Sequence, residues 1–476
     1  MGHVEGESRY QRQLLAPSLD ETIAADHPIR VVDAFVDTLN LRDLGFAKVA
    51  AAAEGRPPYR PGDLLKLYVY GYLNQMRSSR RLEREAARNL EARWLINGVT
   101  PSFKTIADFR RDHAAAIVGV CRSFVRFCRG QSLYGGELVA IDGTKLEAAA
   151  SRKRVITRKQ LAEQTAKLDE KIAAYLSAMD AADREEAAGE AQPADVAAAL
   201  AALRRQREAT QAEAKALAEA GLNHKVEGEP EARLMKTARH GHQVAYNAQS
   251  AVDAKHGLIV AFDLTAECND QRQLLPMALA AKATLAAETL TVAADCGYAN
   301  GEHGQACQEA GIVAVVPRPL TVNPSDGAAF RRDAFAYDAA SDSWTCPAGE
   351  TLSLRKVSQS EQKKVYSTAA CAGCALKPRC TNAANRSVTR GFHEDVREAM
   401  HQRALQDPGF MKRRRELVEH PFGAIKWMLG HPRFLLRGLQ KAKAELALAV
   451  LGFNLKRSIA ILGVPALLDS LQASPA

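Results

Sequence analysis

The sequence predicts an α/β protein in which a sheet-forming core follows an all-helical region and is interrupted by inserted segments. Short apolar runs typical of buried strands alternate with helical patterns beyond residue 131. Two of these runs end in an aspartate: residues 138–141 precede Asp142, and residues 289–294 precede Asp295. Ligands gather outside the carboxyl ends of strands in open α/β sheets, so both carboxylates are candidate site residues. For Asp142, a simple Asp-Gly turn is the alternative.

The composition narrows the class of protein. The chain has 476 residues, long enough for about three domains, and its 47% hydrophobic and 25% charged residues are ordinary for a globular protein. Its net charge of +9 favours a polyanionic partner, with nucleic acid the natural candidate. No apolar run approaches the roughly 18 residues of a membrane span, and the first 30 residues lack the apolar core of a signal peptide. We therefore expect a cytoplasmic protein without disulfides, whose nine cysteines are buried, reactive or metal-bound.

Residues 1–130 are predicted to form a helical DNA-binding domain. The proline- and glycine-rich stretch 55–63 separates a first helical region from a helix that begins near Leu64. A second helix is expected over residues 82–95 and a third from Ser102, and such short helices with tight joins resemble helix-turn-helix units. Residues 54–112 hold 12 Lys or Arg against 7 Asp or Glu, so more than half of the net charge lies here.

A cluster of arginines in this domain is expected to present several guanidinium groups on one helical face. The residues are Arg77, Arg80, Arg81, Arg84 and Arg88. We expect them to contact DNA phosphates. A solvated charged helix, partnered by Glu83, Glu85 and Glu91, is the alternative.

The sheet pattern of residues 131–152 stops at an insertion, residues 153–239, and resumes over residues 240–325. The insertion is rich in Ala, Glu, Lys and Arg and carries apolar residues at heptad-like spacing. These are Leu161, Leu168, Ile172, Tyr175 and Met179, with Val196, Leu200, Leu203 and Leu217 after an interruption at residues 189–193. We expect an antiparallel helical hairpin, which could grip DNA or a second protomer, or act as a passive spacer.

The resumed pattern predicts four more strands and two helices. The strands are expected over residues 244–252, 258–264, 289–294 and 312–316, and the helices over 271–286 and 299–310. Residues 253–257 provide a hairpin turn between the first two of these strands. With residues 138–141 as the first strand, this is the element order of the ribonuclease H-like fold, with a mixed five-stranded sheet and flanking helices.

Residues 326–390 form a cysteine-rich, zinc-ribbon-like insertion. Cys346 is followed by Cys371 and Cys374, with two residues between them, and then by Cys380. Four thiols so spaced are typical of a structural zinc site, and metal is expected to supply stability that the few apolar residues nearby cannot. Four unrelated buried cysteines are the alternative. The other cysteines show no ligand spacing and are expected in the core: Cys121, Cys128, Cys268, Cys296 and Cys307.

Residues 391–462 are predicted to complete the core. One or two helices are expected over residues 394–429, with a break at Pro421. An apolar helix over residues 442–462 is expected to cover the sheet. The final residues, 463–476, are small and polar and predict a flexible tail.

The two aspartates should meet, because the first and fourth strands of a ribonuclease H-like sheet are parallel neighbours. Two carboxylates at adjacent strand ends repel each other unless a cation lies between them. Mg²⁺ prefers such oxygen ligands, and two ions about 4 Å apart could activate a nucleophile and stabilise a leaving oxygen, with Mn²⁺ as an alternative. We therefore expect Asp142 and Asp295 to bind magnesium together with a third carboxylate.

Glu419 is the expected third carboxylate. Arg415 lies four residues before it, on the same helical face, where it can orient the acid. Lys426 lies seven residues after it and can meet the scissile phosphate. Glu416 is the competing acid; weaker candidates are Glu394, Asp395 and Glu398.

These motifs resemble those of the DDE transposases of bacterial insertion sequences. The matching phrases are Asp142-Gly-Thr-Lys, Asp295-x-Gly-Tyr and Arg415-x3-Glu419-x6-Lys426. The phrase EHPFGAIK, residues 419–426, is close to one sub-branch with a helical N-terminal domain and a cysteine-rich insertion, and the resemblance covers most of residues 10–460. One departure stands out: Lys412 occupies the position of the motif's tyrosine, which leaves open the contact of that tyrosine with DNA.

The resemblance implies a transposase that binds the terminal inverted repeats of its element. Such an enzyme hydrolyses one strand with metal-activated water and then joins the freed 3′-hydroxyl to target DNA, without a covalent protein intermediate. It implies double-stranded DNA as the partner, both element ends and target, a homodimer in the DNA complex and a location on the nucleoid. A catalytically silent DNA-binding regulator or domesticated remnant, a nuclease without strand transfer and a zinc-organised scaffold are the alternatives.

Overall fold

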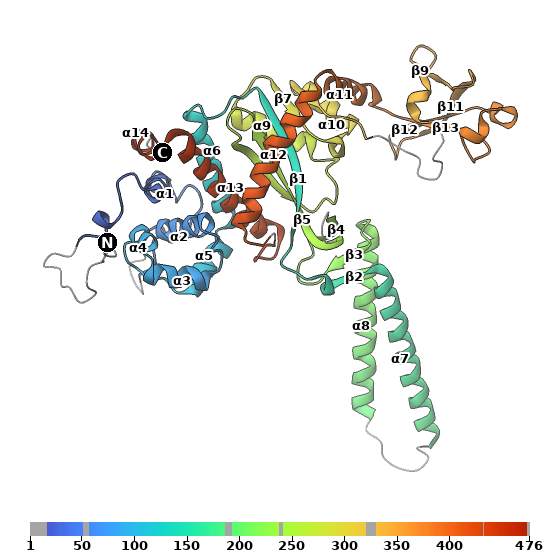
Figure 1. Ribbon diagram of the computed structural model, residues 1–476. Coiled ribbons are helices and arrows are strands. Elements are labelled where there is room, and N and C mark those ends of the chain that lie inside the picture. Colours follow the sequence, from blue (N-terminus) through green and yellow to red (C-terminus); the bar gives the residue numbers. More distant parts are fainter. Residues whose placement is uncertain are drawn as a thin grey trace, which may run out of the picture.

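The structure is a computed structural model that describes residues 17–50, 57–185, 193–237, 241–319, 330–431 and 433–473 (Figure 1). The interruption expected at residues 189–193 falls largely outside these ranges. A central sheet lies between a helical domain on one side and a small second sheet on the other, and a long two-helix arm projects away from it (Figure 1).

Six α-helices form the described part of the N-terminal domain. They are α1 (Pro28–Asp37), α2 (Pro61–Leu73), α3 (Ser79–Arg88), α4 (Leu90–Leu95), α5 (Phe103–Asp112) and α6 (Ala114–Gly130). α2 is buried along nearly its whole length, so its neighbours pack around it. The single helix expected over residues 82–95 is wrong, because Asn89 is extended and its side chain accepts a hydrogen bond from the Ala92 N–H, which starts a new helix. The helix expected from Ser102 is confirmed, and the Ser102 hydroxyl caps it.

The central sheet has six strands in the described residues. They are β1 (Leu138–Glu147), β4 (Arg233–Thr237), β5 (Gly241–Asp253), β6 (Ile259–Thr265), β7 (Leu290–Ala293) and β8 (Ile312–Val315). Their order is β4-β5-β1-β7-β8, with β6 also paired to β5. β1 is antiparallel to β5 and parallel to β7, so the predicted parallel neighbours are confirmed. β4 was expected inside the helical insertion, but it pairs with β5 and adds a sixth strand.

β1 is longer than predicted, and the Asp142-Gly143 pair is not a turn. Residues beyond Ile141 continue the antiparallel pairing with β5, with Asp142 opposite Ser250. The parallel partner β7 pairs only with the first residues of β1, Leu138 to Ala140. Asp142 therefore lies just beyond the parallel pairing, at the level where β7 ends.

Helices cover the two faces of this sheet (Figure 1). α9 (Leu274–Leu285) and α10 (Gly301–Glu309) lie on one face, and α12 (Pro408–Met428) and α13 (Leu439–Leu462) on the other. α13 covers the edge strand β6 as predicted: the Asn454 amide bonds both the N–H and the C=O of Ile259. The break expected at Pro421 is wrong, since Pro421 lies inside α12 and the chain breaks at Asp407, after α11 (Glu394–Gln406).

The helical insertion forms the projecting arm. α7 (Arg158–Glu185) and α8 (Pro193–Glu219) run side by side and stand on a two-stranded sheet of β2 (Val155–Thr157) and β3 (His224–Val226) (Figure 1). The apolar residues predicted at heptad-like spacing between these two helices are buried only in part. Leu161 and Leu168 are buried, whereas Tyr175 is 41% exposed.

A second, five-stranded sheet follows the core. Its order is β13-β12-β11-β10-β9, with bounds β9 (Ala336–Asp338), β10 (Ser343–Thr345), β11 (Thr351–Ser358), β12 (Lys363–Ser367) and β13 (Ser387–Gly391). This sheet has its own small core of Phe335, Trp344, Leu352, Tyr366 and Val388. Apolar residues therefore do form a core here, and the expectation that metal supplies stability beyond it stays a prediction.

The expected flexible tail is wrong for residues 463–473, the part of that segment that the structure describes. Val464–Ala473 forms helix α14, which packs against α1. Leu467 and Leu471 are buried in this contact region, and such apolar burial is worth about 1.5–3 kcal/mol for each side chain. Within the described residues, no single helix has both the length and the apolar composition to cross a membrane, and only the sharply bent pair of α13 and α14 meets those criteria jointly.

Candidate active site

Asp142 lies on the face of β1 that α12 covers. Its Oδ1 accepts a hydrogen bond from the Gly143 N–H and forms an ion pair with Nη2 of Arg414, both at 2.9 Å. Arg414 is buried and also donates to the Ile141 carbonyl at 2.7 Å. Burial raises the pKa of the Asp142 carboxyl, Arg414 opposes the rise, and the nearby Asp295 adds to it. Asp142 is therefore a largely desolvated carboxylate with one fixed positive partner.

Asp295 directly follows β7 and caps a short 3-10 turn, Cys296–Tyr298. Its Oδ1 accepts a hydrogen bond from the Gly297 N–H at 2.8 Å. Because β7 is the parallel neighbour of β1, Asp295 comes close enough to raise the pKa of Asp142. The structure thus brings these two carboxylates into electrostatic contact.

A third aspartate, which the sequence analysis missed, lies beside them. Asp270 is in the loop between β6 and α9, and its Oδ1 accepts hydrogen bonds from Nδ2 of Asn247 and Nε2 of Gln249, each at 2.7 Å. Nζ of Lys145 is 3.5 Å from the same oxygen. Asn247 and Gln249 are buried in β5, so Asp270 is held by donors from the centre of the sheet.

Tyr298 is linked to Asp270 through Gln249. Its hydroxyl donates a hydrogen bond to Oε1 of Gln249. Burial raises the pKa of Tyr298 well above its ordinary value, and the negative charges of Asp270, Asp142 and Asp295 raise it further. The phenol therefore stays protonated and remains a donor.

α12 carries the expected third carboxylate on an exposed stripe. At about 100° per residue, Arg415, Glu419 and Lys426 lie within about 40° of one another around the helix. All three are exposed. Glu419 lies about 140° around the helix from Arg414, and its carboxylate forms no hydrogen bond or ion pair with any residue that the structure describes. The helix that carries Glu419 thus contacts Asp142 through Arg414.

The competing acids are less well placed. Glu416 is also exposed, but it lies about 60° around α12 from Glu419, outside the stripe that Arg415, Glu419 and Lys426 share. Glu394 is buried between two arginines. Asp395 and Glu398 each form an ion pair with another arginine.

Four of the five arginines expected to bind DNA are exposed on α3, within an arc of about 100°. They are Arg80, Arg81, Arg84 and Arg88. The prediction for Arg77 is wrong, because Arg77 precedes α3 and is buried. It donates to Oε2 of Glu445 at 3.3 Å and to the carbonyl of Arg433 at 2.8 Å, so it ties the N-terminal domain to the C-terminal helices.

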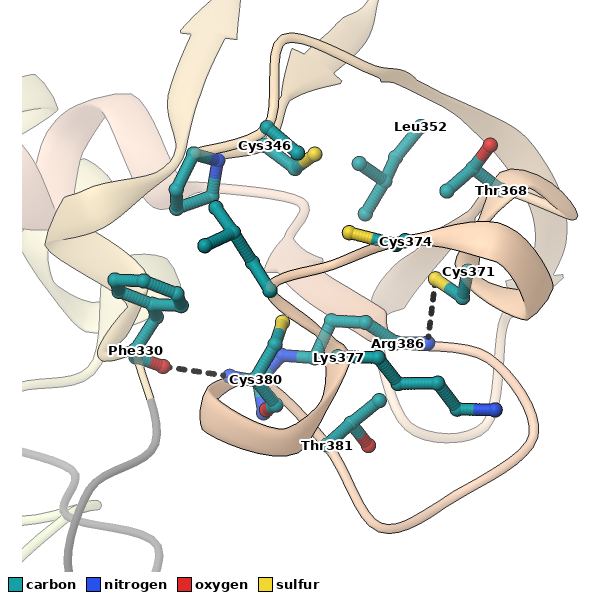
Figure 2. Close-up of a pocket in the computed structure, with 13 residues that line it drawn as sticks. Phe330, Cys346, Leu352, Thr368, Cys371, Cys374, Lys377, Cys380, Thr381 and Arg386 are labelled. Atoms are coloured by element: carbon teal, nitrogen blue, oxygen red, sulfur yellow. Dashed lines mark hydrogen bonds between the residues drawn. The ribbon is translucent and has the colours of Figure 1, made fainter.

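The four cysteines expected to bind zinc line one small cavity (Figure 2). Cys346 follows β10, and Cys371, Cys374 and Cys380 lie between β12 and β13. The backbone N–H of Arg386 donates to Sγ of Cys371 at 3.4 Å. The donor set suits zinc chemically. However, among the described residues no group of three or more His, Cys, Asp or Glu side chains is close enough together to hold a metal ion, at this cavity or at the aspartates.

The remaining cysteines divide into two groups. Cys121, Cys128 and Cys307 are buried, as predicted. Cys268 and Cys296 are exposed, so their expected place in the core is wrong. Cys268 lies in the loop that carries Asp270, and Cys296 lies in the short 3-10 turn that follows Asp295.

Asp270 and Arg414 escaped prediction because neither directly follows an apolar run. The sequence does contain a pattern that predicts a polar partner such as Asp270. Asn247 and Gln249 alternate within an otherwise apolar strand, which places two amides on one buried face. Buried amides need hydrogen-bond partners, so this pattern predicts a polar group above that face.

Two known protein families match segments near the two ends of the described chain. The family described as "Transposase domain (DUF772)" matches residues 17–112, which include α1 to α5. The family described as "Transposase DDE domain" matches residues 345–459, which include the cysteine-rich segment and α12. No curated protein and no solved structure matches the chain. With a helical transposase domain before the central sheet and a DDE domain after it, these matches support a DDE transposase of an insertion sequence.

Proposed function

We propose that this chain is an active transposase that binds the terminal inverted repeats of its element, cleaves DNA strands with a divalent metal and joins the ends to target DNA. One observation carries the proposal: Asp142 and Asp295 interact across neighbouring parallel strands, and the segments before and after them match transposase families.

Asp142 and Asp295 would hold Mg²⁺, or Mn²⁺ in its place, because two interacting carboxylates offer the oxygen ligands that these cations prefer. A bound pair of ions supplies an activated water and stabilises the leaving oxygen. Arg414 holds Asp142 in position, and the Gly297 N–H holds Asp295.

Glu419 is the proposed third carboxylate. Arg415 shares its stripe and can orient it, and Lys426 on the same stripe can contact the phosphate next to the cut. This assignment is supported by the shared exposure of the three side chains and by the contact of their helix with β1. Lys412 lies on the same side of α12, within about 20° of Glu419, and adds positive charge where the family motif has tyrosine.

The exposed arginines of α3 are the proposed DNA-binding surface, with the element ends as their ligand and target DNA engaged in the same complex. A homodimer in the DNA complex and a place on the nucleoid in the cytoplasm complete the proposal. The basic net charge of +9 is consistent with such a partner.

A structural zinc ion is proposed for Cys346, Cys371, Cys374 and Cys380. The shared cavity and the N–H···S hydrogen bond to Cys371 support it. Elemental analysis of metal-replete protein should find one zinc per chain, and Cys374→Ser should lower that content. Protein that contains no zinc after expression in zinc-rich medium would eliminate this part of the proposal.

The decisive experiment incubates purified protein with end DNA and Mg²⁺. Wild type should nick the element end and then join it to target DNA. Asp142→Asn, Asp295→Asn and Glu419→Gln should each abolish both steps, whereas Glu416→Gln, outside the stripe that carries Glu419, should keep them. Binding without nicking would indicate a silent regulator, and nicking without joining would indicate a nuclease.

A further inference from the structure

We propose that Asp270 is a positioning residue for the active site. It acts through a hydrogen-bonded relay, Asp270 to Gln249 to Tyr298, that fixes the turn on which Asp295 is mounted. The inference rests on the proposed function, which assigns Asp295 to the reaction. The relay joins three segments: the loop before α9, the strand β5 and the turn after β7.

Gln249 is the middle of the relay, and Asp270 fixes its orientation. Nε2 of Gln249 donates to Oδ1 of Asp270 at 2.7 Å, and Oε1 accepts from the Tyr298 hydroxyl. An ionised carboxylate can only accept hydrogen bonds, so the amide must turn its NH₂ group toward Asp270 and its oxygen toward Tyr298. Gln249 is 1% exposed, so water does not offer an alternative partner.

Tyr298 transmits this constraint to Asp295. Tyr298 is fully buried, and its N–H donates to the Asp295 carbonyl at 3.1 Å within the short turn. The phenol therefore anchors one end of the turn while Asp295 forms the other. Oδ2 of Asp270 also lies against the turn, 3.9 Å from where a side chain at Gly297 would begin.

The carboxylate of Asp270 is itself held firmly. Asn247 donates to the same oxygen at 2.7 Å, and Lys145 approaches it to 3.5 Å. Gly143 leaves the necessary room, because a Cβ there would lie 2.7 Å from Oδ1 of Asp270 and would overlap the Gln249 amide. The network therefore lies directly against Gly143, on the face of β1 opposite the side chain of Asp142.

Stability alone does not account for this arrangement. Well-packed apolar side chains of similar volume often stabilise a protein interior as well as a buried polar network does. Asn247 also keeps one buried oxygen, Oδ1, without a hydrogen-bond partner among the described residues, which is a cost to the fold. A network of this kind is better explained by the need to hold Asp295 in one position.

The test uses the full-length protein and two readouts. The first is Mn²⁺ binding without DNA, measured by electron paramagnetic resonance, and the second is the rate of end cleavage. Asp270→Ala and Tyr298→Phe should each weaken both by about 10- to 100-fold, the usual effect of removing a partner that orients a metal ligand. The double variant should lose no more than the single variant with the larger loss, because both changes break the same relay.

Two further variants separate positioning from folding. Asp270→Asn keeps an acceptor oxygen for both amides and should recover most of the loss. Asp263→Ala removes a carboxylate of β6 that forms an ion pair with Lys443, and it should match wild type in both readouts. Tyr298→Phe removes a single hydroxyl, so the test stands even where Asp270→Ala does not fold.

Wild-type Mn²⁺ affinity in both Asp270→Ala and Tyr298→Phe would overturn the relay, and so would losses that multiply in the double variant. A wild-type protein that binds no Mn²⁺ would overturn it as well. Wild type that binds Mn²⁺ but cleaves no end DNA would count against the proposed function alone, since the binding measurements would still decide whether the relay holds.

Discussion

Arg414 gives Asp142 a permanent positive partner from the helix on the other side of the site. The guanidinium is buried, bonds both the carboxylate and the Ile141 carbonyl, and leaves its Nε without a partner among the described residues. Removing such a partner leaves a poorly hydrated charge behind, which costs more than the pair itself contributes. At the scale of residues, Arg414 therefore governs whether Asp142 can stay ionised while desolvated.

Arg414→Ala should lower the free energy of unfolding by about 3 kcal/mol, because Asp142 becomes an unpaired, largely desolvated charge. The double variant Asp142→Asn with Arg414→Ala should recover part of that loss. Urea unfolding measures both. The matched control is Arg413→Ala, an exposed neighbour on the same helix, which should change stability by less than about 0.5 kcal/mol. Equal stability of Arg414→Ala and wild type would show that Arg414 does not stabilise the ionised Asp142.

At the scale of elements, the sequence predicts best where burial is simple. The strands expected over residues 289–294 and 312–316 match β7 and β8 closely. β7 is a central strand of the covered sheet, and β8, at its edge, still buries Ile312, Ala314 and Val315. The failures have local causes. Asn89 caps a new helix inside a continuous helical pattern, and the polar residues after Asp142 stay in β1 because β5 pairs with them. α14 forms because α1 offers it an apolar surface.

The candidate site shows the same contrast between residues that a local sequence pattern reveals and residues that only a distant contact places. Asp142 and Asp295 could be predicted because each directly follows a short apolar run in the sequence. Arg414 could not, because its contact with Ile141 joins residues 273 apart in the sequence. Arg77 was misassigned for the same reason: its partner Glu445 is 368 residues away, and no local pattern distinguishes a buried arginine from an exposed one.

The N-terminus of α11 offers a test of how the second sheet is attached. Glu394 is buried and accepts from Arg332 at 2.8 Å and from Arg397 at 3.0 Å. Burial alone would raise the pKa of Glu394, but the two arginines outweigh it and hold the pKa below the ordinary 4.5. A lowered carboxyl pKa adds stability above the unfolded value, and that stability is lost as the pH falls through the folded value.

Glu394→Gln should therefore destabilise the protein at neutral pH by about 1–3 kcal/mol, because two partly buried arginines lose the carboxylate that accepts their hydrogen bonds. The stability of the variant should also depend less on pH below 4.5 than that of wild type. Thermal unfolding followed from about pH 7 to about pH 3 measures both effects. Glu398→Gln, which breaks a more exposed ion pair, is the control. An unchanged pH profile in Glu394→Gln would show that the two arginines do not perturb this carboxyl.

At the scale of the whole molecule, Glu445 joins the helical N-terminal domain to the central sheet and its covering helices. It is fully buried in α13, where Oε2 accepts from Arg77 and lies 3.9 Å from Arg110, while Oε1 accepts the N–H groups of Leu435 and Leu436. The arginines of α3 are thereby held at a fixed place relative to Asp142, so DNA bound by one part would be presented to the other.

DNA affinity should fall steeply as salt rises, because arginines displace condensed counterions from the phosphates. Replacing Arg80, Arg81, Arg84 and Arg88 by alanine should reduce the slope of log K against log salt by about 0.9 for each phosphate that the variant no longer neutralises. Fluorescence anisotropy with labelled end DNA measures the slope. Replacing Arg355 and Lys356, two exposed residues of β11, should leave it unchanged. A flat response in wild type would rule out α3 as the binding surface.

The junction between the projecting arm and the core affects how this chain can vary in evolution. The arm leaves and re-enters the core at one place, where β2 pairs with β3 and the Arg158 N–H bonds the Asn223 carbonyl. Because its two ends are adjacent, the arm can be shortened, lengthened or exchanged without shifting β1 or β5. We expect homologous chains to differ most in this arm, while the strands on either side of it keep their positions.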